Sequence, residues 1–90
     1  MAEVVWSSET LGQLHAIRAH IAVENPYAAR RVFLRVAAAS DSLALMPNRG
    51  RPISQDRREL TYVRPYLIRH AIKGGRVLIL EVRHAARRPK

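Results

Sequence analysis

The sequence contains no cysteine and no long apolar run. Without cysteine the chain can form neither disulfides nor thiolate metal sites, and it carries no cysteine nucleophile. No apolar stretch approaches the roughly 20 residues of a membrane span, and the N-terminus lacks the basic start and apolar segment of a secretion signal. We therefore expect a protein of the reducing cytoplasm with no membrane partner. No residue pattern indicates a cofactor or a metal site.

Lysine is scarce as well, although the chain is strongly basic. Sixteen basic residues stand against seven acidic ones, which gives a net charge of +9, and only Lys73 and Lys90 are lysines. The other fourteen are arginines, whose planar guanidinium group matches phosphate and carboxylate oxygens better than an ammonium group does. A GC-rich genome also favours arginine over lysine, so both explanations of the ratio stay open.

The basic residues are concentrated in the second half of the chain. Residues 1–46 hold four basic and four acidic residues, whereas residues 47–90 hold twelve basic and three acidic ones. The whole net charge of +9 therefore lies in the second half. Such a concentrated positive charge attracts an anionic partner. Nucleic acid and an acidic polypeptide are the two classes that fit.

The length fits one domain. Ninety residues leave room for a single hydrophobic core, and 48% hydrophobic with 26% charged residues are the proportions of a globular protein. We therefore expect residues 1–90 to fold as one domain.

Hydrophobic spacing predicts a short strand and two helices in the first half. The strand covers residues 4–6, a first helix begins at Ser7 or Ser8 and ends at Asn25, and a second helix follows and runs to about Met46. Serine and asparagine side chains cap helix N-termini, and a proline follows each predicted helix end. The short connection makes the two helices an antiparallel hairpin.

A basic loop then leads to three strands, where the hydrophobic period changes from 3.6 to about 2. The strands are predicted at residues 59–64, 66–73 and 76–84. The element order is β-α-α-β-β-β, which is typical of the α+β class. We expect the helical hairpin to pack on one face of a mostly antiparallel four-stranded sheet.

The register of the last two strands decides which side chains lie under the helices. A three-residue loop of Gly74, Gly75 and Arg76 separates an apolar face from a charged one. The apolar face then pairs Ile72 with Leu78, His70 with Leu80, Ile68 with Val82 and Tyr66 with His84. The opposite face carries Lys73, Arg69, Glu81 and Arg83, with Arg69 directly across from Glu81. We therefore predict one helix-covered face and one open face that bears arginines.

Five stretches in this order resemble a known family of small bacterial toxins. They are residues 7–14, 25–29, 45–52, 63–70 and 78–84. Together they cover essentially the whole chain and resemble the RelE/ParE superfamily of type II toxin-antitoxin operons. The resemblance implies the same fold that the residue patterns predict.

The resemblance implies two different targets, because the superfamily divides by function. RelE-like toxins are ribosome-dependent endoribonucleases that cut messenger RNA, and they place an arginine after the aromatic residue of the penultimate strand and a tyrosine near the C-terminus. Here Leu67 follows Tyr66, and no tyrosine follows His84. These departures favour the ParE-like branch, whose members poison DNA gyrase without catalysis. A non-toxic binding module is a further alternative.

The nuclease alternative has its own candidate residues. His84 would act as the general base, with Arg64 and Arg69 around the scissile phosphate. The structural alternatives are that His84 packs beneath Tyr66 and that Arg69 only pairs with Glu81.

The resemblance also implies a cognate antitoxin, which we expect to be acidic and partly disordered before it folds onto the toxin. Candidate contacts to the antitoxin or the target are arginines of the second half. They are Arg49, Arg51, Arg57, Arg58, Arg64, Arg69, Arg83, Arg87 and Arg88. For the first four, a solvated loop is the alternative explanation.

Overall fold

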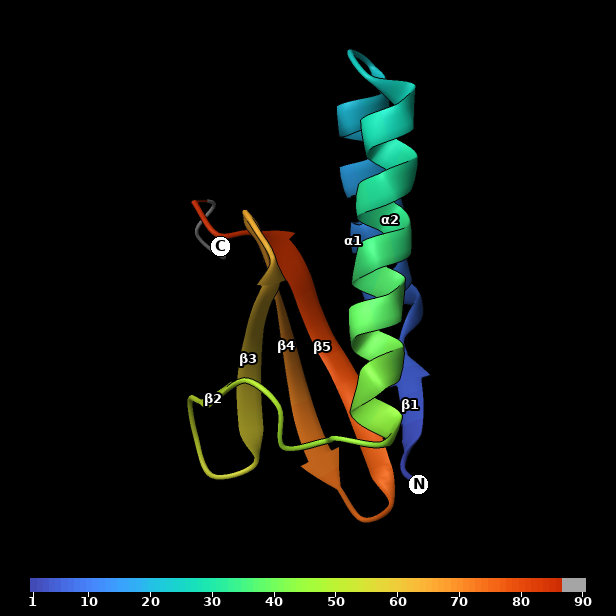
Figure 1. Cartoon of the computed structure of the whole chain (residues 1–90). Helices are drawn as coiled ribbons and strands as arrows, with labels where there is room; N and C mark the ends of the chain where they lie inside the picture. Colours follow the sequence, from blue (N-terminus) through green and yellow to red (C-terminus); the bar gives the residue numbers. More distant parts are fainter. Residues whose placement is uncertain (87–90) are drawn as a thin grey trace.

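The computed structural model describes residues 1–86, which form a five-stranded sheet with two helices on one face. Figure 1 shows the helical hairpin beside β5 and β1, with its tip extending past the end of the sheet. The elements are β1 (Glu3–Trp6), α1 (Ser8–Ala22), α2 (Pro26–Asp41), the 3₁₀ turn η1 (Ser42–Ala44), β2 (Arg51–Pro52), β3 (Arg57–Val63), β4 (Tyr66–Lys73) and β5 (Arg76–His84). The predicted α+β class and element order are confirmed, but the sheet has five strands rather than the predicted four, because the loop after the helices contains the two-residue β2.

The sheet order is β1-β5-β4-β3-β2. Only β1 and β5 run parallel, and the other neighbouring strands are antiparallel. The helical hairpin that follows β1 returns the chain to the end of the sheet where β1 begins. The first strand is therefore an edge strand beside the last one. This arrangement brings the N-terminal strand and α1 next to the C-terminal strand.

Side-chain caps explain where the helices begin. Ser7 accepts a hydrogen bond from the Thr10 amide (3.1 Å), and the Thr10 hydroxyl accepts one from the Ser7 amide (2.9 Å). At the second helix, Asn25 Oδ1 accepts from the Ala28 amide (3.0 Å), and Pro26 occupies the first helical position. Both caps satisfy backbone donors that a helix start leaves unpaired.

The second α-helix ends at Asp41, before the predicted Met46. The chain continues as the 3₁₀ turn Ser42–Ala44, where the Ser42 hydroxyl donates to the Ala39 carbonyl (2.6 Å). Such side-chain bonds to backbone carbonyls compete with helix continuation. The proline at position 47 therefore follows a turn that has already closed the helix.

The hydrophobic core lies between the helices and one face of the sheet. It consists of Leu14, Val36, Leu43, Leu60, Val63, Ile68, Val77, Ile79 and Val82. Every strand from β3 to β5 contributes, so burial of this face holds the helical hairpin to the sheet.

The β4–β5 register was predicted correctly for only one half of the ribbon. Far from the turn, Arg69 pairs with Glu81 and Tyr66 with His84, as expected. Near the turn, Ile72 pairs with Val77 rather than with Leu78, because the loop is the two-residue Gly74-Gly75 turn. The prediction that Leu78 and Leu80 lie under the helices is wrong: Val77 and Ile79 belong to the core.

A β-bulge at Leu80 reconciles the two registers. His70 pairs with Ile79 and Arg69 with Glu81, so Leu80 is the extra residue on β5. The bulge lets Val77 and Ile79 face the core on one side of it and Val82 on the other. Burial of both halves therefore selects an irregular ribbon over a regular one.

His70 links β4 to the segment that follows the helices. Its side chain is fully buried, and Nε2 donates a hydrogen bond to the Pro47 carbonyl at 2.9 Å. Burial lowers the pKa of His70, with a further lowering from the Arg58 charge that the Pro47 bond opposes. The predicted core position of His70 is confirmed. The neutral ring has a structural role, because it joins β4 to the segment that contains Pro47.

Within residues 1–86, neither helix is long and apolar enough to cross a membrane.

Gly50 is expected to be intolerant of any side chain. Its φ of +87° is unfavourable for other residues, and an added Cβ would lie 2.5 Å from the Glu59 carbonyl oxygen on β3. We predict that Gly50→Ala lowers the free energy of unfolding by about 2 kcal/mol, measured by urea denaturation. Gly12 in α1 has open space around it, so the control Gly12→Ala should raise stability by up to about 1 kcal/mol. Equal effects of the two substitutions would contradict this account.

Candidate functional site

A row of alternating charges crosses four strands on the sheet face opposite the helices. Cross-strand pairing aligns Arg51, Glu59, Arg69 and Glu81, and Arg83 follows on the same face of β5. Leu60 and Ile68, which are next to Glu59 and Arg69 in the chain, point into the core, so the charged side chains point the other way. We call these five residues the arginine–glutamate ladder.

Glu59 is the central acceptor of the ladder. Its Oε1 accepts hydrogen bonds from Arg51 Nη2 (3.1 Å) and Nε (3.3 Å), and its Oε2 accepts from Arg69 Nε (3.0 Å). Only 6% of the Glu59 side chain is exposed. Burial alone would raise the pKa of Glu59, but the hydrogen bonds and charges of Arg69 and Arg51 outweigh it and lower the pKa below its ordinary value.

Glu81 continues the ladder toward the end of the sheet. Its Oε1 lies 3.7 Å from Arg69 Nη1 and 3.3 Å from Arg83 Nε. The ladder thus contains three guanidinium groups and two carboxylates. The open, arginine-bearing face that the sequence predicts is present, but its arginines are engaged with glutamates of the same face.

Two other candidate arginines hold the loop after the helices. Arg49 Nη1 donates to the Ser42 hydroxyl (2.9 Å), and its guanidinium lies 4.7 Å from the centre of the Tyr62 ring. Arg58 Nη1 donates to the Gly50 carbonyl (3.0 Å). These contacts are structural, because they join the loop to η1 and β3.

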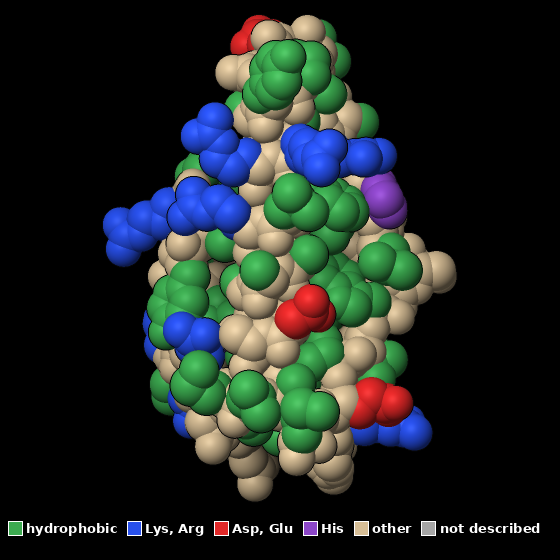
Figure 2. All heavy atoms as spheres, turned by 45° about the vertical axis from the view of Figure 1, so that its right-hand side comes forward, with side chains coloured by type: hydrophobic (Ala, Val, Ile, Leu, Met, Phe, Trp, Pro, Cys, Tyr) green, Lys and Arg blue, Asp and Glu red, His purple; other side chains and the backbone are tan. Residues whose placement is uncertain are grey.

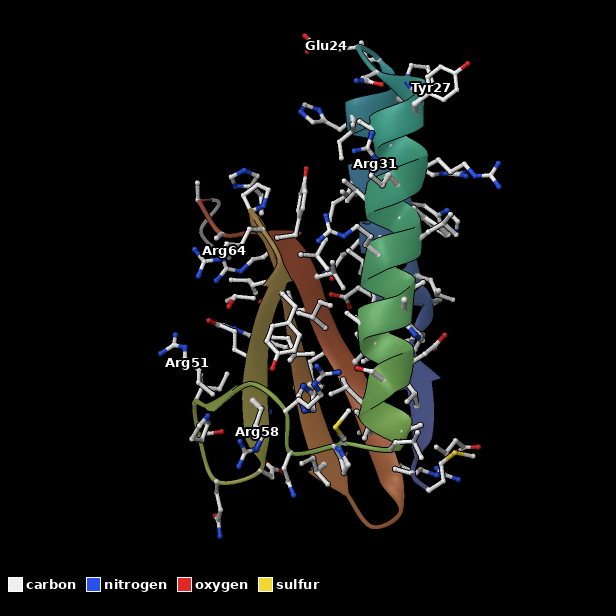
Figure 3. The ribbon with its side chains drawn as sticks, viewed as in Figure 1. Glu24, Tyr27, Arg31, Arg51, Arg58 and Arg64 are labelled. Carbon is white, nitrogen blue, oxygen red and sulfur yellow. The ribbon has the colours of Figure 1, made fainter. Side chains whose placement is uncertain are left out.

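Arg51, Arg57 and Arg64 are the exposed members of the predicted set within residues 1–86, and Arg51 is held by Glu59. Figure 3 shows Arg64 at the β3–β4 turn, on the side of the sheet away from the helical hairpin. Within residues 1–86, no hydrogen bond or ion pair engages the Arg57 or Arg64 side chain. Arg87 and Arg88 lie outside the described residues.

The three residues of the nuclease alternative are not brought together on one face. The His84 ring meets the Tyr66 ring edge-on at 5.5 Å, as the packing alternative expected. Both pair across β4 and β5 on the face of Ile68, whereas Arg69 belongs to the ladder on the opposite face. His84 Nδ1 accepts a hydrogen bond from the Ala86 amide (3.0 Å), which places the proton of a neutral imidazole on Nε2.

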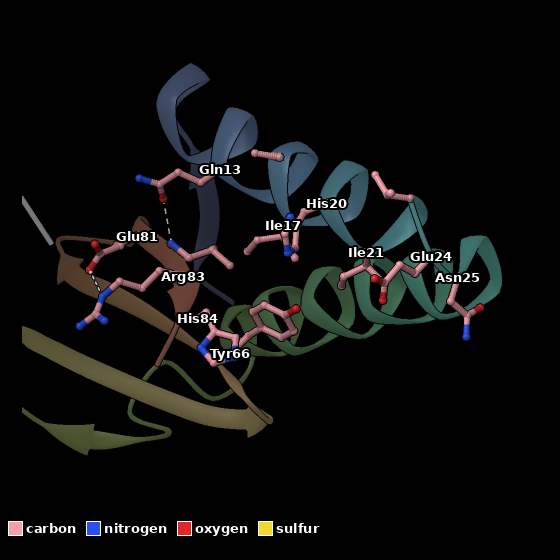
Figure 4. A pocket seen from close by; sticks show the side chains of 13 residues that line it. Gln13, Ile17, His20, Ile21, Glu24, Asn25, Tyr66, Glu81, Arg83 and His84 are labelled. Atoms are coloured by element: carbon pink, nitrogen blue, oxygen red, sulfur yellow. Dashed lines mark hydrogen bonds and ion pairs between the residues drawn. The ribbon is translucent and has the colours of Figure 1, made fainter. Parts of the chain in front are cut away.

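A groove of about 710 Å³ separates α1 from the end of β5. Figure 4 shows its walls: α1 on one side and the last residues of β5 with Tyr66 on the other. Its lining includes Gln13, Ile17, His20, Ile21, Tyr66 and residues 81–84. The groove combines apolar walls with polar groups, as binding sites commonly do.

The sequence analysis assigned no role to Gln13. In the structure, Gln13 Oε1 accepts a hydrogen bond from the Val82 amide of β5 at 2.9 Å. One available signal pointed to this region. The predicted first strand has three residues and the predicted last strand has nine, so part of the last strand must have an edge without a strand partner.

The helical hairpin has basic and apolar side chains on its outer face. Arg30, Arg31 and Arg35 of α2 are exposed, together with Tyr27 and Leu34. Figure 2 shows the Lys and Arg side chains gathered in the upper half of this face, with hydrophobic side chains between and below them. Arginines from the first half of the sequence therefore also form a basic surface, on the helical hairpin.

Across residues 1–86, no group of three or more histidine and carboxylate side chains is arranged to hold a metal ion.

Comparisons with known proteins relate the chain to bacterial toxins. Residues 4–89 match the family model described as the ParE toxin of the type II toxin-antitoxin system parDE. The Toxin RelE2 of Caulobacter vibrioides is 48% identical over 87 residues, which cover 97% of this chain and 99% of the relative. The putative toxin Y4kP of Sinorhizobium fredii is 39% identical over 82 residues, covering 89% and 84% of the two chains.

A solved structure shares the fold. A chain of the chromosomal ParDE toxin-antitoxin system from P. aeruginosa superposes with a TM-score of 0.80 and covers 93% of this chain and 96% of its own. The two sequences are 24% identical, so this likeness shows the architecture of helical hairpin and sheet and nothing finer.

Replacing Glu59 should expose the strength of the ladder. We predict that Glu59→Gln lowers the free energy of unfolding at pH 7 by about 2 kcal/mol, because Arg51 and Arg69 lose their shared charged acceptor. The ordinary pKa of Glu59 is 4.5, and its pKa in the folded protein is lower. The charged carboxylate therefore stabilises the wild type at pH values above 4.5, and this stabilisation is lost as the pH falls through the folded-state pKa. The difference between variant and wild type should therefore shrink below pH 4.5, as measured by urea denaturation at several pH values.

Glu3→Gln is the matched control for this substitution. Glu3 pairs with Arg76 at 3.2 Å, but both side chains are about two-thirds exposed. The control should change stability by less than about 0.5 kcal/mol. A loss as large as that of Glu59→Gln would show that burial of the ladder is unimportant.

Proposed function

The chain belongs to the family of ParE toxins of type II toxin-antitoxin systems, and we propose that it inhibits bacterial growth by binding and poisoning DNA gyrase. As a toxin of such a system, it has a cognate antitoxin as a partner. The proposal makes the protein a binding protein rather than a catalyst. It therefore requires surfaces for two macromolecules and no site for bond cleavage.

The environment of His84 is the observation that carries the choice of gyrase. RNA cleavage without a metal needs a base near the 2′-hydroxyl and cations around the same phosphate. His84 Nδ1 already accepts from the Ala86 amide, which leaves a protonated Nε2 that donates rather than accepts. Arg69 is held by Glu59 and Glu81 on the other face of the sheet. This arrangement supports binding over catalysis.

One observation favours a second candidate function, the ribosome-dependent endoribonuclease. The relative from Caulobacter vibrioides, 48% identical over nearly its full length, carries the name Toxin RelE2. In that case His84 would have to adopt the other tautomer and release the Ala86 amide. Arg64, at the same end of the sheet, would supply the cation.

We further propose that the exposed cations of the sheet side attract the antitoxin. The arginine–glutamate ladder has one guanidinium in excess, and Arg57 and Arg64 are exposed and unengaged within residues 1–86. An acidic, partly disordered polypeptide would be steered to these groups before it folds onto the toxin. Arg49 and Arg58 contribute less, because their donors already bond within the chain.

Two parallel assays test the target. The purified protein is added to gyrase with supercoiled plasmid, and separately to a translation extract programmed with a defined messenger RNA. We predict gyrase-dependent double-strand breaks in the plasmid and an intact message, with the breaks abolished when the protein is first mixed with its cognate antitoxin. Codon-linked cleavage of the message with unaffected gyrase would reject the proposal and establish the second candidate.

The steering role of the sheet-side cations predicts a kinetic effect. The double substitution Arg57→Ala/Arg64→Ala should slow association with the antitoxin about threefold or more at low salt and weaken its salt dependence. Stopped-flow mixing measures both. Arg30→Ala/Arg31→Ala removes the same charge from α2 and is the matched control, with a smaller expected effect. Equal slowing by the two double variants would mean that only net charge matters.

A further inference from the structure

The last strand is longer than its parallel neighbour. β5 runs from Arg76 to His84, but β1 pairs only with residues 76–79. Beyond Ile79, the edge of β5 that faces away from β4 has no strand partner within residues 1–86. About five residues of backbone, close to 17 Å of extended chain, are therefore available along one edge.

Two hydrogen bonds fix the direction of the backbone groups along this edge. The Val82 amide points away from β4, because it bonds to Gln13 of α1. The Ala85 amide points the opposite way and donates to the Pro65 carbonyl (2.9 Å). Successive residues of a strand alternate in direction, so the amide and carbonyl groups of His84 point to the open edge, as does the Val82 carbonyl.

Gln13 occupies the edge as a neighbouring strand would. Its side-chain amide has the same chemistry as a peptide group, and its Oε1 lies 2.9 Å from the Val82 nitrogen. A strand carbonyl makes the same bond to an edge amide. Gln13 is thus a single-residue substitute for the missing strand, which satisfies one donor.

The groove beside α1 opens along this edge. Four consecutive residues of β5, 81–84, line it, although their side chains alternate between the two faces of the sheet. A cavity that contacts four successive residues of one strand follows the strand edge rather than one face. Ile17 and Ile21 of α1 form its apolar wall (Figure 4).

We propose that a segment of the cognate antitoxin adds to the sheet as a strand along β5 at residues 80–84, and that one of its carbonyls replaces Gln13 Oε1 at the Val82 amide. This inference rests on the assignment of the chain as a toxin with an antitoxin partner, and not on gyrase as the target. Strand addition uses backbone bonds for affinity and alternate side chains for specificity. The alternate side chains of the segment would contact Ile17 and Ile21.

An acidic segment fits the edge by charge. The whole chain carries a net charge of +9. The ladder, with three guanidinium groups and two carboxylates, lies on one side of the edge, and His20, Glu24 and His84 line the groove on the other. A helix lying in the groove would leave Gln13 bonded to Val82. The fate of this one hydrogen bond therefore distinguishes an added strand from a docked helix.

The first test removes the substitute. Under strand addition, Gln13→Ala should bind the purified cognate antitoxin about threefold to tenfold more tightly than the wild type, because no hydrogen bond has to be broken first. Ile17→Ala, one turn further along α1, should bind more weakly and serves as the control for groove contacts. Isothermal titration calorimetry measures both affinities, and thermal denaturation confirms that each variant is folded. Weaker binding by Gln13→Ala would overturn the proposal.

The second test observes the edge directly. Amide hydrogen exchange, followed by NMR on the labelled protein, should slow at least tenfold at His84 when the antitoxin is bound, because its amide then donates to the added strand. The Ala85 amide already donates to Pro65 and should change little. Unchanged exchange at His84 in a stoichiometric complex would overturn strand addition but leave the antitoxin partnership intact. If the antitoxin formed no complex at all, the partnership itself would fail.

Discussion

Pairing between β4 and β5 determines what each face of the sheet presents. The two strands run antiparallel along most of their length, and a single extra residue at Leu80 divides the ribbon into two registers. Val77, Ile79 and Val82 all reach the core because of that bulge. The same pairing sets Arg69 opposite Glu81 and so aligns the arginine–glutamate ladder on the other face. The core and the charged face are two consequences of one register.

Much of the fold could be predicted because local patterns decide it. The bounds of the strands at residues 66–73 and 76–84 agree with the structure, and Asn25 caps the second helix as expected. Two features could not be predicted. The bulge occurs at a leucine, with no glycine to mark it, and is selected by burial of Val77 and Ile79 under helices that are distant in sequence. The early end of α2 depends on a serine hydroxyl that bonds backwards to Ala39.

The candidate site was harder to predict, because its contacts join distant parts of the chain. Counting charges indicated a basic surface but not which arginines are already engaged. The pair of Arg69 with Glu81 followed from the register, whereas Glu59, which holds Arg51 and Arg69, was not assigned a role. Gln13 reaches a residue 69 positions away, and only the helix packing brings the two together. Composition therefore indicates the sign of the surface charge, and tertiary structure distributes it.

The bond between Gln13 and Val82 also bears on how the protein behaves when it is alone. Exposed strand edges are the places where copies of a protein join one another and aggregate. The Gln13 side chain accepts the hydrogen bond of the Val82 amide, and α1 lies beside the edge. Both features make such self-association less favourable. A toxin that has parted from its antitoxin would then be less prone to join a second copy at this edge.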